Sequence, residues 1–374
     1  MRAFDLSKFG KALQKSNSNI SIGFNDPTVW VSSGNYALNY LVSGDFQKGF
    51  PIDGKMTVLA GESGSGKSYI SSGSVIKWCQ EHGVQVILLD TEHAIDKSWV
   101  SKLGVDSEKG VMKIDVGLID DITSIVMGLL NDYKAEYKDT PYEEKPPLLV
   151  VIDSLGMATT GTEVKQAEEG DNKGDMGRKQ KQLYSMCRTF MASVGNNPIG
   201  MLATQHTYKS QDLYLKDDIV SGGRSIEFTP SILVVMTKKK LKDEDSETSS
   251  GVKQEAKNVV GVRVNAIVRK TRYNKPFQPC SFEIPYDKGL NPYSGLFDLL
   301  STQLKYKDRY ILNQTGAWVC YYDLKTGEEI FKKYRKQITS ADYDRIMADY
   351  MAVKDEYTPP AEEDEAAEAD VDGE

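Results

Sequence analysis

A glycine-rich segment most strongly constrains the fold of this 374-residue chain: Gly61-Glu62-Ser63-Gly64-Ser65-Gly66-Lys67-Ser68. It directly follows the apolar run Met56–Ala60, and a helical pattern extends after it through Ile76. The segment fits G-x-x-x-x-G-K-[ST] between a strand and a helix. Such a loop turns its N–H groups and the positive end of the next helix toward phosphate oxygens. We therefore predict that Gly61–Ser68 binds a nucleoside triphosphate, with Lys67 at the β- and γ-phosphates and Ser68 on Mg²⁺.

The rest of the central region alternates between strand and helix patterns. Helix 178–194 has one apolar face and ends at Gly195, and near-continuous β-branched runs predict strands at Val84–Asp90, Leu148–Asp153, Ile199–Thr204, Ile232–Met236, Val259–Val268 and Cys280–Ile284. This alternation predicts an α/β fold with a mostly parallel, twisted sheet flanked by helices. Three polar segments are predicted to lie outside it: an exposed insertion (131–147), an irregular segment (206–225) and a solvent loop (238–258).

Composition divides the chain into four regions. We expect an N-terminal helix and linker (1–27), a core (28–302), a small C-terminal region with a helix near 340–353 (303–356), and a disordered acidic tail (357–374). Residues Pro359–Glu374 hold eight acids and no Lys or Arg, and the rest of the chain carries equal numbers of basic and acidic residues. The net charge of −8 therefore belongs to the tail. The tail serves either solubility or competition with nucleic acid for basic surface.

Several classes of protein are disfavoured. No apolar run reaches the roughly 18 residues that span a bilayer, and the N-terminus lacks the apolar centre of a signal peptide. We therefore expect a cytoplasmic protein without a membrane partner. The four cysteines form no C-x-x-C pair and the three histidines are scattered, so we expect buried free thiols rather than a zinc site.

Two further carboxylates follow predicted strands. Asp153 ends the most hydrophobic strand, where a buried carboxylate is costly unless it has a partner, and positioning Mg²⁺ through water would supply one. Glu92 lies just after the strand that ends at Asp90, where it is placed to orient or deprotonate water in line with the γ-phosphate. A helix cap or a surface salt bridge is the alternative for Glu92.

In their order along the chain, these segments resemble the RecA family of strand-exchange recombinases, most closely the UvsX recombinases of T4-like bacteriophages. The resemblance covers about residues 28–302 and includes Asp90–Asp96, Trp99–Asp106, Leu149–Ser154 and Ser221–Ser225. It implies a RecA-type ATPase core that uses ATP and Mg²⁺. It also implies that Glu92 activates water, that Trp99 stacks on adenine and that Asp96 accepts from the adenine amino group.

The resemblance assigns further roles. Gln205 would report the γ-phosphate state to a DNA-binding loop, and Lys270 and Arg272 would reach a neighbouring subunit's nucleotide. The two loops facing DNA would be about 156–177 and 206–223, although their composition alone favours mobile lids. The DNA-binding candidates at and around these loops are Arg178, Lys179, Tyr208, Lys209, Tyr214, Lys216, Gly222, Gly223 and Arg224. The residues after about 303 do not resemble the bacterial RecA carboxyl domain.

The resemblance implies an ATP-dependent recombinase that forms filaments on single-stranded DNA and pairs it with homologous duplex DNA. Its partners would be those DNAs, further copies of the chain, a recombination mediator and a single-stranded-DNA-binding protein, in the host cytoplasm if phage-encoded. Two alternatives stay open: a ring-forming DNA helicase on the same core, and an ATP-gated DNA-binding scaffold without catalysis.

Overall fold

The computed structural model describes residues 4–16, 26–170, 177–209, 218–242 and 259–356. Contacts divide the chain into two units, Met1–Gly295 and Leu296–Glu374. This division falls before the predicted boundary at 302/303, because helix α9 (Leu296–Thr302) packs on β13 and β14 of the second unit. Among the described residues, no helix has the length and apolar character needed to cross a bilayer.

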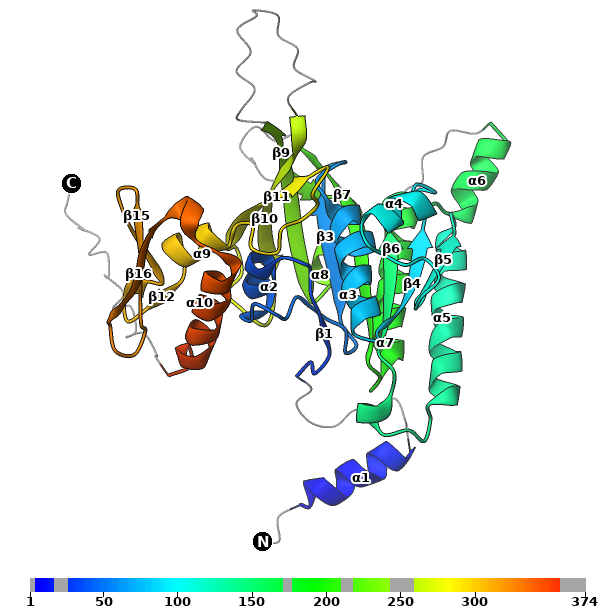
Figure 1. The fold of residues 1–374 in the computed structure, drawn as a ribbon. Coiled ribbons are helices and arrows are strands. Elements are labelled where there is room, and N and C mark those ends of the chain that lie inside the picture. Colours follow the sequence, from blue (N-terminus) through cyan, green and yellow to red (C-terminus); the bar gives the residue numbers. More distant parts are fainter. Residues whose placement is uncertain (1–3, 17–25, 171–176, 210–217, 243–258, 357–374) are drawn as a thin grey trace, which may run out of the picture. The chain divides into compact units, whose positions relative to one another are not determined.

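The first unit contains a nine-stranded sheet in the order β11-β10-β9-β3-β7-β6-β4-β5, with β8 beside β7 (Figure 1). Its strands are β3 (Met56–Gly61), β4 (Gln85–Asp90), β5 (Val111–Asp115), β6 (Leu148–Asp153), β7 (Ile199–Lys209), β8 (Asp218–Val220), β9 (Ile232–Lys242), β10 (Val259–Lys270) and β11 (Pro279–Pro285). The six strands from β9 to β5 are parallel, whereas β10 and β11 are antiparallel. The predicted mostly parallel α/β core is confirmed.

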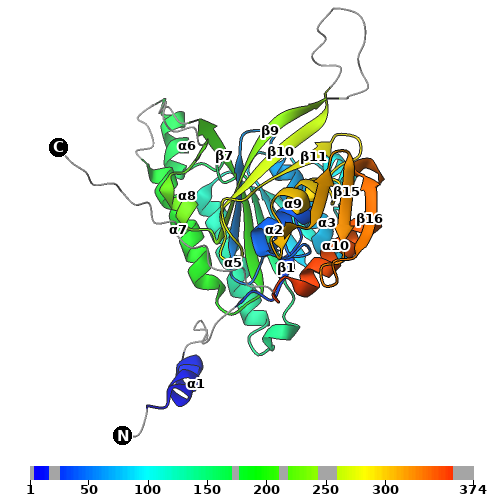
Figure 2. The ribbon, with the colours of Figure 1, turned by 90° about the vertical axis from the view of Figure 1, so that its left-hand side faces the viewer.

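Helices cover both faces of this sheet (Figure 2). Helices α5 (Ile119–Glu136) and α7 (Arg178–Val194) pack on one face, where Val126, Leu130 and Phe190 join the buried side chains of β3 and β6. The π-helical turn η1 (Tyr69–Ser74) and α3 (Val75–Glu81) lie on the other face. The remaining elements of this unit are α1 (Leu6–Ser16), β1 (Trp30–Val31), α2 (Tyr36–Ser43), β2 (Phe50–Pro51), α4 (Lys97–Lys102), η2 (Tyr142–Glu144), α6 (Gly161–Glu168) and α8 (Arg224–Phe228).

Three sequence predictions about segments outside the sheet were partly wrong. Helix α5 continues to Glu136 and buries Tyr133, so the predicted insertion begins within a helix. Strand β9 continues through the lysine-rich residues to Lys242, because pairing with β10 satisfies its backbone there. The predicted irregular segment contains the end of β7, strand β8 and helix α8, and β7 and β8 form an antiparallel ribbon. The acidic tail lies outside the described residues.

The second unit has its own small core. Strands β14 (Leu312–Thr315), β15 (Trp318–Tyr322) and β16 (Glu329–Tyr334) form an antiparallel sheet, and β12 (Lys305–Tyr306) pairs with β13 (Arg309–Tyr310). After η3 (Arg335–Gln337), helix α10 (Ser340–Val353) begins at a capping box between Thr339 and Asp342. The buried Tyr321 donates a hydrogen bond to Asp349 of α10 over 2.8 Å, which joins the helix to the sheet.

Candidate nucleotide site

The glycine-rich loop begins at the carboxyl end of β3 and is held tightly there. A Cβ on Gly61 would lie 2.3 Å from the carbonyl oxygen of Met236 and 2.6 Å from Ser65 Oγ. Gly64 and Gly66 adopt positive φ angles of 72° and 88°, which other residues rarely tolerate. The spacing of glycines in the sequence therefore follows from close backbone approach at the first position and from left-handed turns at the other two.

Lys67 is buried against the same loop, with 6% of its surface exposed. Its ammonium donates hydrogen bonds to the carbonyl oxygens of Gly61 (3.0 Å) and Glu62 (2.9 Å). Burial lowers the pKa of Lys67, and the nearby carboxylates of Asp153 and Glu92 act in the opposite direction. The carboxylates thus favour the charged form of Lys67, and a buried ammonium is suited to bind an anion such as a phosphate group.

Asp153 lies at the end of β6 among hydroxyl groups. Its carboxylate accepts a hydrogen bond from Thr204 of β7, Ser72 Oγ lies 3.2 Å from its Oδ2, and the Ser68 hydroxyl is close enough to lower its pKa. Burial raises the pKa of this carboxyl, although the hydroxyl donors oppose the shift. The structure thus brings Ser68 and Asp153 together, as the sequence predicted. Carboxylate and hydroxyl oxygens are the donor types that Mg²⁺ prefers.

Glu92 lies in the turn after β4, and its neighbours hold it from both sides. Its Oε1 accepts a hydrogen bond from Ser154 Oγ (2.8 Å) and lies 3.2 Å from Nε2 of His206. Asp90 shapes the turn, because its carboxylate accepts from the backbone N–H groups of Glu92 (3.1 Å) and Ile95 (3.0 Å). No local sequence signal marks His206, because it becomes Glu92's partner only through the pairing of β7 with β6 and of β6 with β4.

A cleft of about 400 Å³ opens beside the loop. It is lined by Gly64, Lys67 and Ser68, by the predicted base-stacking residue Trp99, and by Tyr286, which the sequence did not single out. Asp96, a predicted adenine contact, accepts a hydrogen bond from the backbone N–H of Trp99 over 2.7 Å and caps α4. This hydrogen bond and a second one from the Ser98 hydroxyl (2.8 Å) lower the pKa of Asp96.

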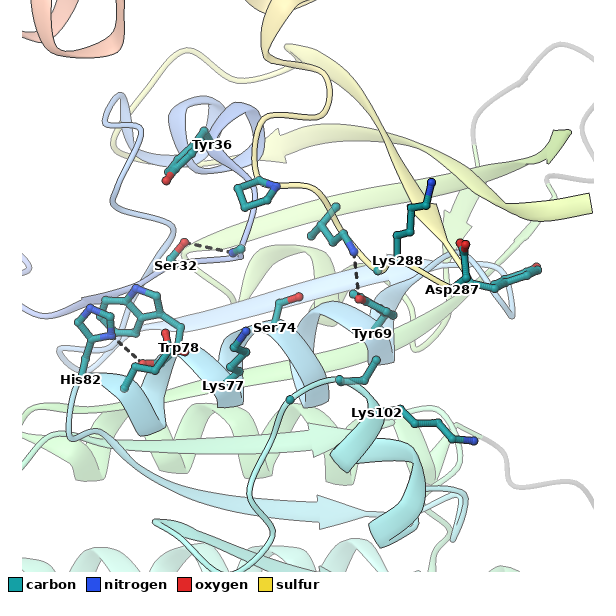
Figure 3. A pocket seen from close by; sticks show the side chains of 18 of the residues that line it. Ser32, Tyr36, Tyr69, Ser74, Lys77, Trp78, His82, Lys102, Asp287 and Lys288 are labelled. Atoms are coloured by element: carbon teal, nitrogen blue, oxygen red, sulfur yellow. Dashed lines mark hydrogen bonds between the residues drawn. The ribbon is translucent and has the colours of Figure 1, made fainter. Parts of the chain in front are cut away.

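A second cavity of about 640 Å³ adjoins the cleft along η1 and α3 (Figure 3). Tyr69, Lys102 and Tyr286 line both spaces. Tyr69 of η1 accepts a hydrogen bond at its hydroxyl from the backbone N–H of Leu290 over 3.0 Å, which fixes the ring between the cavities. The cleft beside the loop therefore continues into a second space along η1 and α3.

The polar groups of the loop are of the kinds that bind Mg²⁺ and a triphosphate. Ser65 Oγ is buried and has no hydrogen-bond partner among the described residues, which is unusual for a buried hydroxyl.

A second cation also contacts the loop: Lys238 of β9 donates a hydrogen bond to the carbonyl oxygen of Ser63. The sequence placed Lys238 in a solvent loop, so this contact was not foreseen.

Gln205 and His206 connect the site to the β7–β8 ribbon. The buried side chain of Gln205 donates to the carbonyl oxygen of Ser221 over 2.8 Å and accepts from the backbone N–H of His206 over 3.0 Å. The backbone N–H of Ser221 in turn donates to the carbonyl oxygen of His206 over 2.8 Å. One pair of consecutive residues therefore contacts both Glu92 and the end of the second predicted loop.

Those predicted DNA-binding residues that the structure describes lie in two places. On the ribbon, Tyr208 is exposed and Lys209 forms an ion pair with Asp218 (2.7 Å), while Gly222 and Gly223 follow β8 with positive φ. At the start of α7, Arg178 is exposed, and Lys179 donates to the carbonyl oxygen of Gly156 over 2.7 Å. Tyr214, Lys216 and the side chain of Arg224 lie outside the described part of the chain.

Lys270 and Arg272 lie away from their own chain's loop. Lys270 pairs with Leu233 near the start of β9, whereas Gly61 pairs with Met236 further along it. Because β9 runs parallel to β3, Lys270 lies toward the amino ends of these strands, whereas the loop lies at the carboxyl end of β3. The ammonium of Lys270 donates to the carbonyl oxygen of Phe228, and burial lowers its pKa.

The fold and the site together define an α/β protein with a phosphate-binding loop at the carboxyl edge of a mostly parallel sheet. Residues 9–127 match the family model of the RecA N-terminal domain. The chain is 24% identical over 295 residues to Protein RecA of Francisella philomiragia, a match that covers 78% of this chain and 72% of that protein.

Two further relatives agree with this match. The recombination and repair protein of phage T4 is 24% identical over 299 residues, covering 79% of this chain and 68% of that protein. The mitochondrial DNA repair protein recA homolog of Dictyostelium discoideum is 23% identical over 274 residues, covering 73% of this chain and 53% of that protein. The chain is therefore similar to RecA-family DNA recombination and repair proteins, among them the phage T4 protein.

Proposed function

We propose that this protein is an ATP-dependent recombinase that polymerises on single-stranded DNA, pairs it with homologous duplex DNA and exchanges strands. One observation carries the coupling of ATP to DNA: Glu92 contacts His206, and the adjacent Gln205 is bonded to Ser221 at the end of the β7–β8 ribbon. A change at Glu92 is thereby transmitted to the segment proposed to bind DNA through three hydrogen-bonded residues.

The loop residues Gly61–Ser68 would hold the triphosphate of ATP, and the cleft beside Trp99 would hold its base. Trp99 offers an indole face for stacking, and Asp96, which caps its helix through one carboxylate oxygen, would accept from the adenine amino group through the other. A Mg²⁺ ion would be held by Ser68 directly and by Asp153 through water, and it would offset negative charge on the phosphates. Lys67 would bind the β- and γ-phosphates.

Glu92 would be the group that orients or deprotonates the attacking water. Ser154 donates to its carboxylate and His206 lies within hydrogen-bonding distance of the same oxygen. Both partners restrict the rotamers of Glu92, and such positioning is a large part of what a phosphoryl-transfer enzyme supplies. Gln205 would report the state of this site to the DNA.

The nucleotide would lie between two subunits of a filament. Lys270 lies toward the opposite edge of the sheet from its own loop, which supports a role for Lys270 and Arg272 at the loop of a neighbouring copy. Two cations from a second subunit would neutralise charge at the phosphates only after assembly. This arrangement would make ATP binding depend on polymerisation.

DNA would lie along the residues that leave the sheet beside Glu92. Tyr208 supplies an exposed ring for stacking and Lys209 a cation, with Arg178 and Lys179 at the start of α7 as further phosphate contacts. Gly222, Gly223 and Arg224 close the same segment, and Tyr214 and Lys216 lie within it. A recombination mediator and a single-stranded-DNA-binding protein would be further partners, in the cytoplasm.

Mixing two inactive variants tests the shared site. Lys67→Ala disables the loop, and the double variant Lys270→Ala/Arg272→Ala disables the opposite edge. With random mixing in equal amounts, about a quarter of interfaces in a head-to-tail filament would contain both intact halves. We expect ATPase activity to reappear in the mixture, and no recovery would overturn the shared site.

Microscopy separates the recombinase from its main rival. With an ATP analogue and single-stranded DNA, we expect helical filaments, and closed six-fold rings would instead support a DNA helicase. Strand-exchange activity without any ATP turnover would support an ATP-gated scaffold.

A further inference from the structure

The three-stranded sheet of the second unit has one buried and one open face. Residues paired across neighbouring strands share a face, as do alternate residues along a strand. Leu312, Tyr321 and Phe331 are in register on one face, and Tyr321 is fully buried beneath α10. The other face carries Trp318 and Tyr334, and it carries Asn313 and Lys332 on either side of the buried Cys320. We call this second face the aromatic face.

Two large rings form a stacked pair on the aromatic face. Trp318 and Tyr334 are direct cross-strand partners, with ring centroids 4.2 Å apart and an interplanar angle of 25°. Trp318 is 39% exposed and Tyr334 is 44% exposed. The ammonium of Lys332 lies 5.6 Å from the centre of the Trp318 ring. Both rings therefore remain partly accessible to solvent, and a cation lies beside one of them.

A cavity of about 330 Å³ lies beside Asn313, on the same side of the sheet. Its lining includes the rings of Tyr310 and Tyr322 together with the cations of Lys307 and Arg309. Tyr310 is also exposed and has the ammonium of Lys305 4.9 Å from its ring centre. The cavity therefore repeats the combination of ring and cation seen at Trp318.

Charge in this unit is divided between strands and helix. Residues 303–337 contain eight basic residues (Lys or Arg) and four acidic ones (Asp or Glu). Residues 338–356 contain two basic residues and five acidic ones. Within residues 259–356 and the other described segments, no acidic side chain forms an ion pair with Lys307, Arg309 or Lys332. The segment that forms the strands thus has a net positive charge, and the segment that contains α10 has a net negative one.

We propose that the aromatic face and its adjoining cavity form a second binding site for single-stranded DNA, separate from the loops of the first unit. Unpaired bases would stack on Trp318, Tyr334 and Tyr310, while phosphates would meet Lys332, Lys307 and Arg309. Duplex DNA fits less well, because its base faces are covered by their neighbours. The choice of DNA as the partner rests on the proposed recombinase function.

The test measures nucleotide-free binding in the full chain carrying Lys67→Ala, which removes nucleotide-dependent binding by the first unit. The probe is a fluorescent oligo(dT), compared with an abasic oligonucleotide of the same length and charge. We expect Trp318→Ala/Tyr334→Ala to weaken oligo(dT) binding about tenfold or more and to leave abasic binding unchanged. Trp318→Phe should restore most of the affinity, because it keeps an aromatic face.

Charge variants supply a second readout that does not depend on the rings. Lys332→Gln should weaken binding to both oligonucleotides and lower the slope of log affinity against log salt by about 0.7. Lys354→Gln, directly after α10, is the charge control, and Phe277→Ala, an exposed ring in the first unit, is the aromatic control.

Several results would overturn the site. Equal affinity for oligo(dT) and abasic DNA would exclude stacking, and preferential binding of duplex would exclude a single-stranded occupant. Unchanged binding by both Trp318→Ala/Tyr334→Ala and Lys332→Gln would remove the face from DNA binding altogether. Failure of the recombinase function would appear separately, as loss of ATP-dependent pairing in the chain with Lys67 intact.

Discussion

Replacing Glu92 with glutamine isolates the chemical step from the architecture of the site. Glutamine keeps an oxygen that can accept the 2.8 Å hydrogen bond from Ser154, and it fills the same volume. The side chain of Glu92 is 35% exposed, so no buried cavity or unpaired buried charge results. We therefore expect the free energy of unfolding to change by about 0.5 kcal/mol or less.

The rate of ATP hydrolysis should respond much more strongly. A positioned general base contributes about 10²–10⁴-fold, which corresponds to roughly 3–5 kcal/mol of activation free energy. Nucleotide affinity should change little, because Lys67 and Ser68 stay in place. Loss of the Glu92 charge also removes one carboxylate that raises the pKa of Lys67. Asp153, whose effect on that pKa is larger, remains.

The assay is phosphate release stimulated by single-stranded DNA, measured beside nucleotide binding and filament formation. We expect Glu92→Gln to bind ATP and DNA, to form persistent filaments and to turn over at least a hundredfold more slowly, as about the lower limit for a lost general base. Glu136→Gln at the end of α5 is the matched control. Turnover by Glu92→Gln within a few-fold of the unmodified chain would refute its catalytic role.

Three further variants probe the neighbouring residues. Lys67→Ala should abolish nucleotide-dependent DNA binding, and undiminished salt-resistant binding would contradict the coupling. Burial raises the pKa of Asp153, so the folded chain loses stability as the pH rises through that pKa. At pH 8, Asp153→Asn should therefore unfold at a higher urea concentration than the unmodified chain, and the difference should shrink as the pH is lowered. The same variant should lose Mg²⁺-dependent nucleotide binding. Equal urea midpoints for the two chains at pH 8 would contradict this account. His206→Leu should reduce stimulation of the ATPase by DNA about tenfold and affect the unstimulated rate less, whereas full stimulation would exclude His206 from the link.

Much of the first unit could be predicted from local sequence. Each parallel strand is buried on both faces, so its apolar run stands out, and the predicted strand at Leu148–Asp153 coincides with β6. Helix α7 likewise occupies the predicted residues 178–194. The polar segments were harder to predict, because β9 beyond Met236 and the β7–β8 ribbon are stabilised by pairing with distant strands rather than by an apolar pattern.

The same distinction applies to the candidate site. By itself, the sequence determined the Gly61–Ser68 loop and the positions of Asp153 and Glu92, because glycine conformation and the ends of apolar strands are local properties. Only the tertiary structure brought His206 to Glu92 and Lys238 to the loop, since these contacts depend on which strands become neighbours. It also exposed Trp318 and Tyr334 on one face of a small sheet, a surface that exists only through cross-strand register.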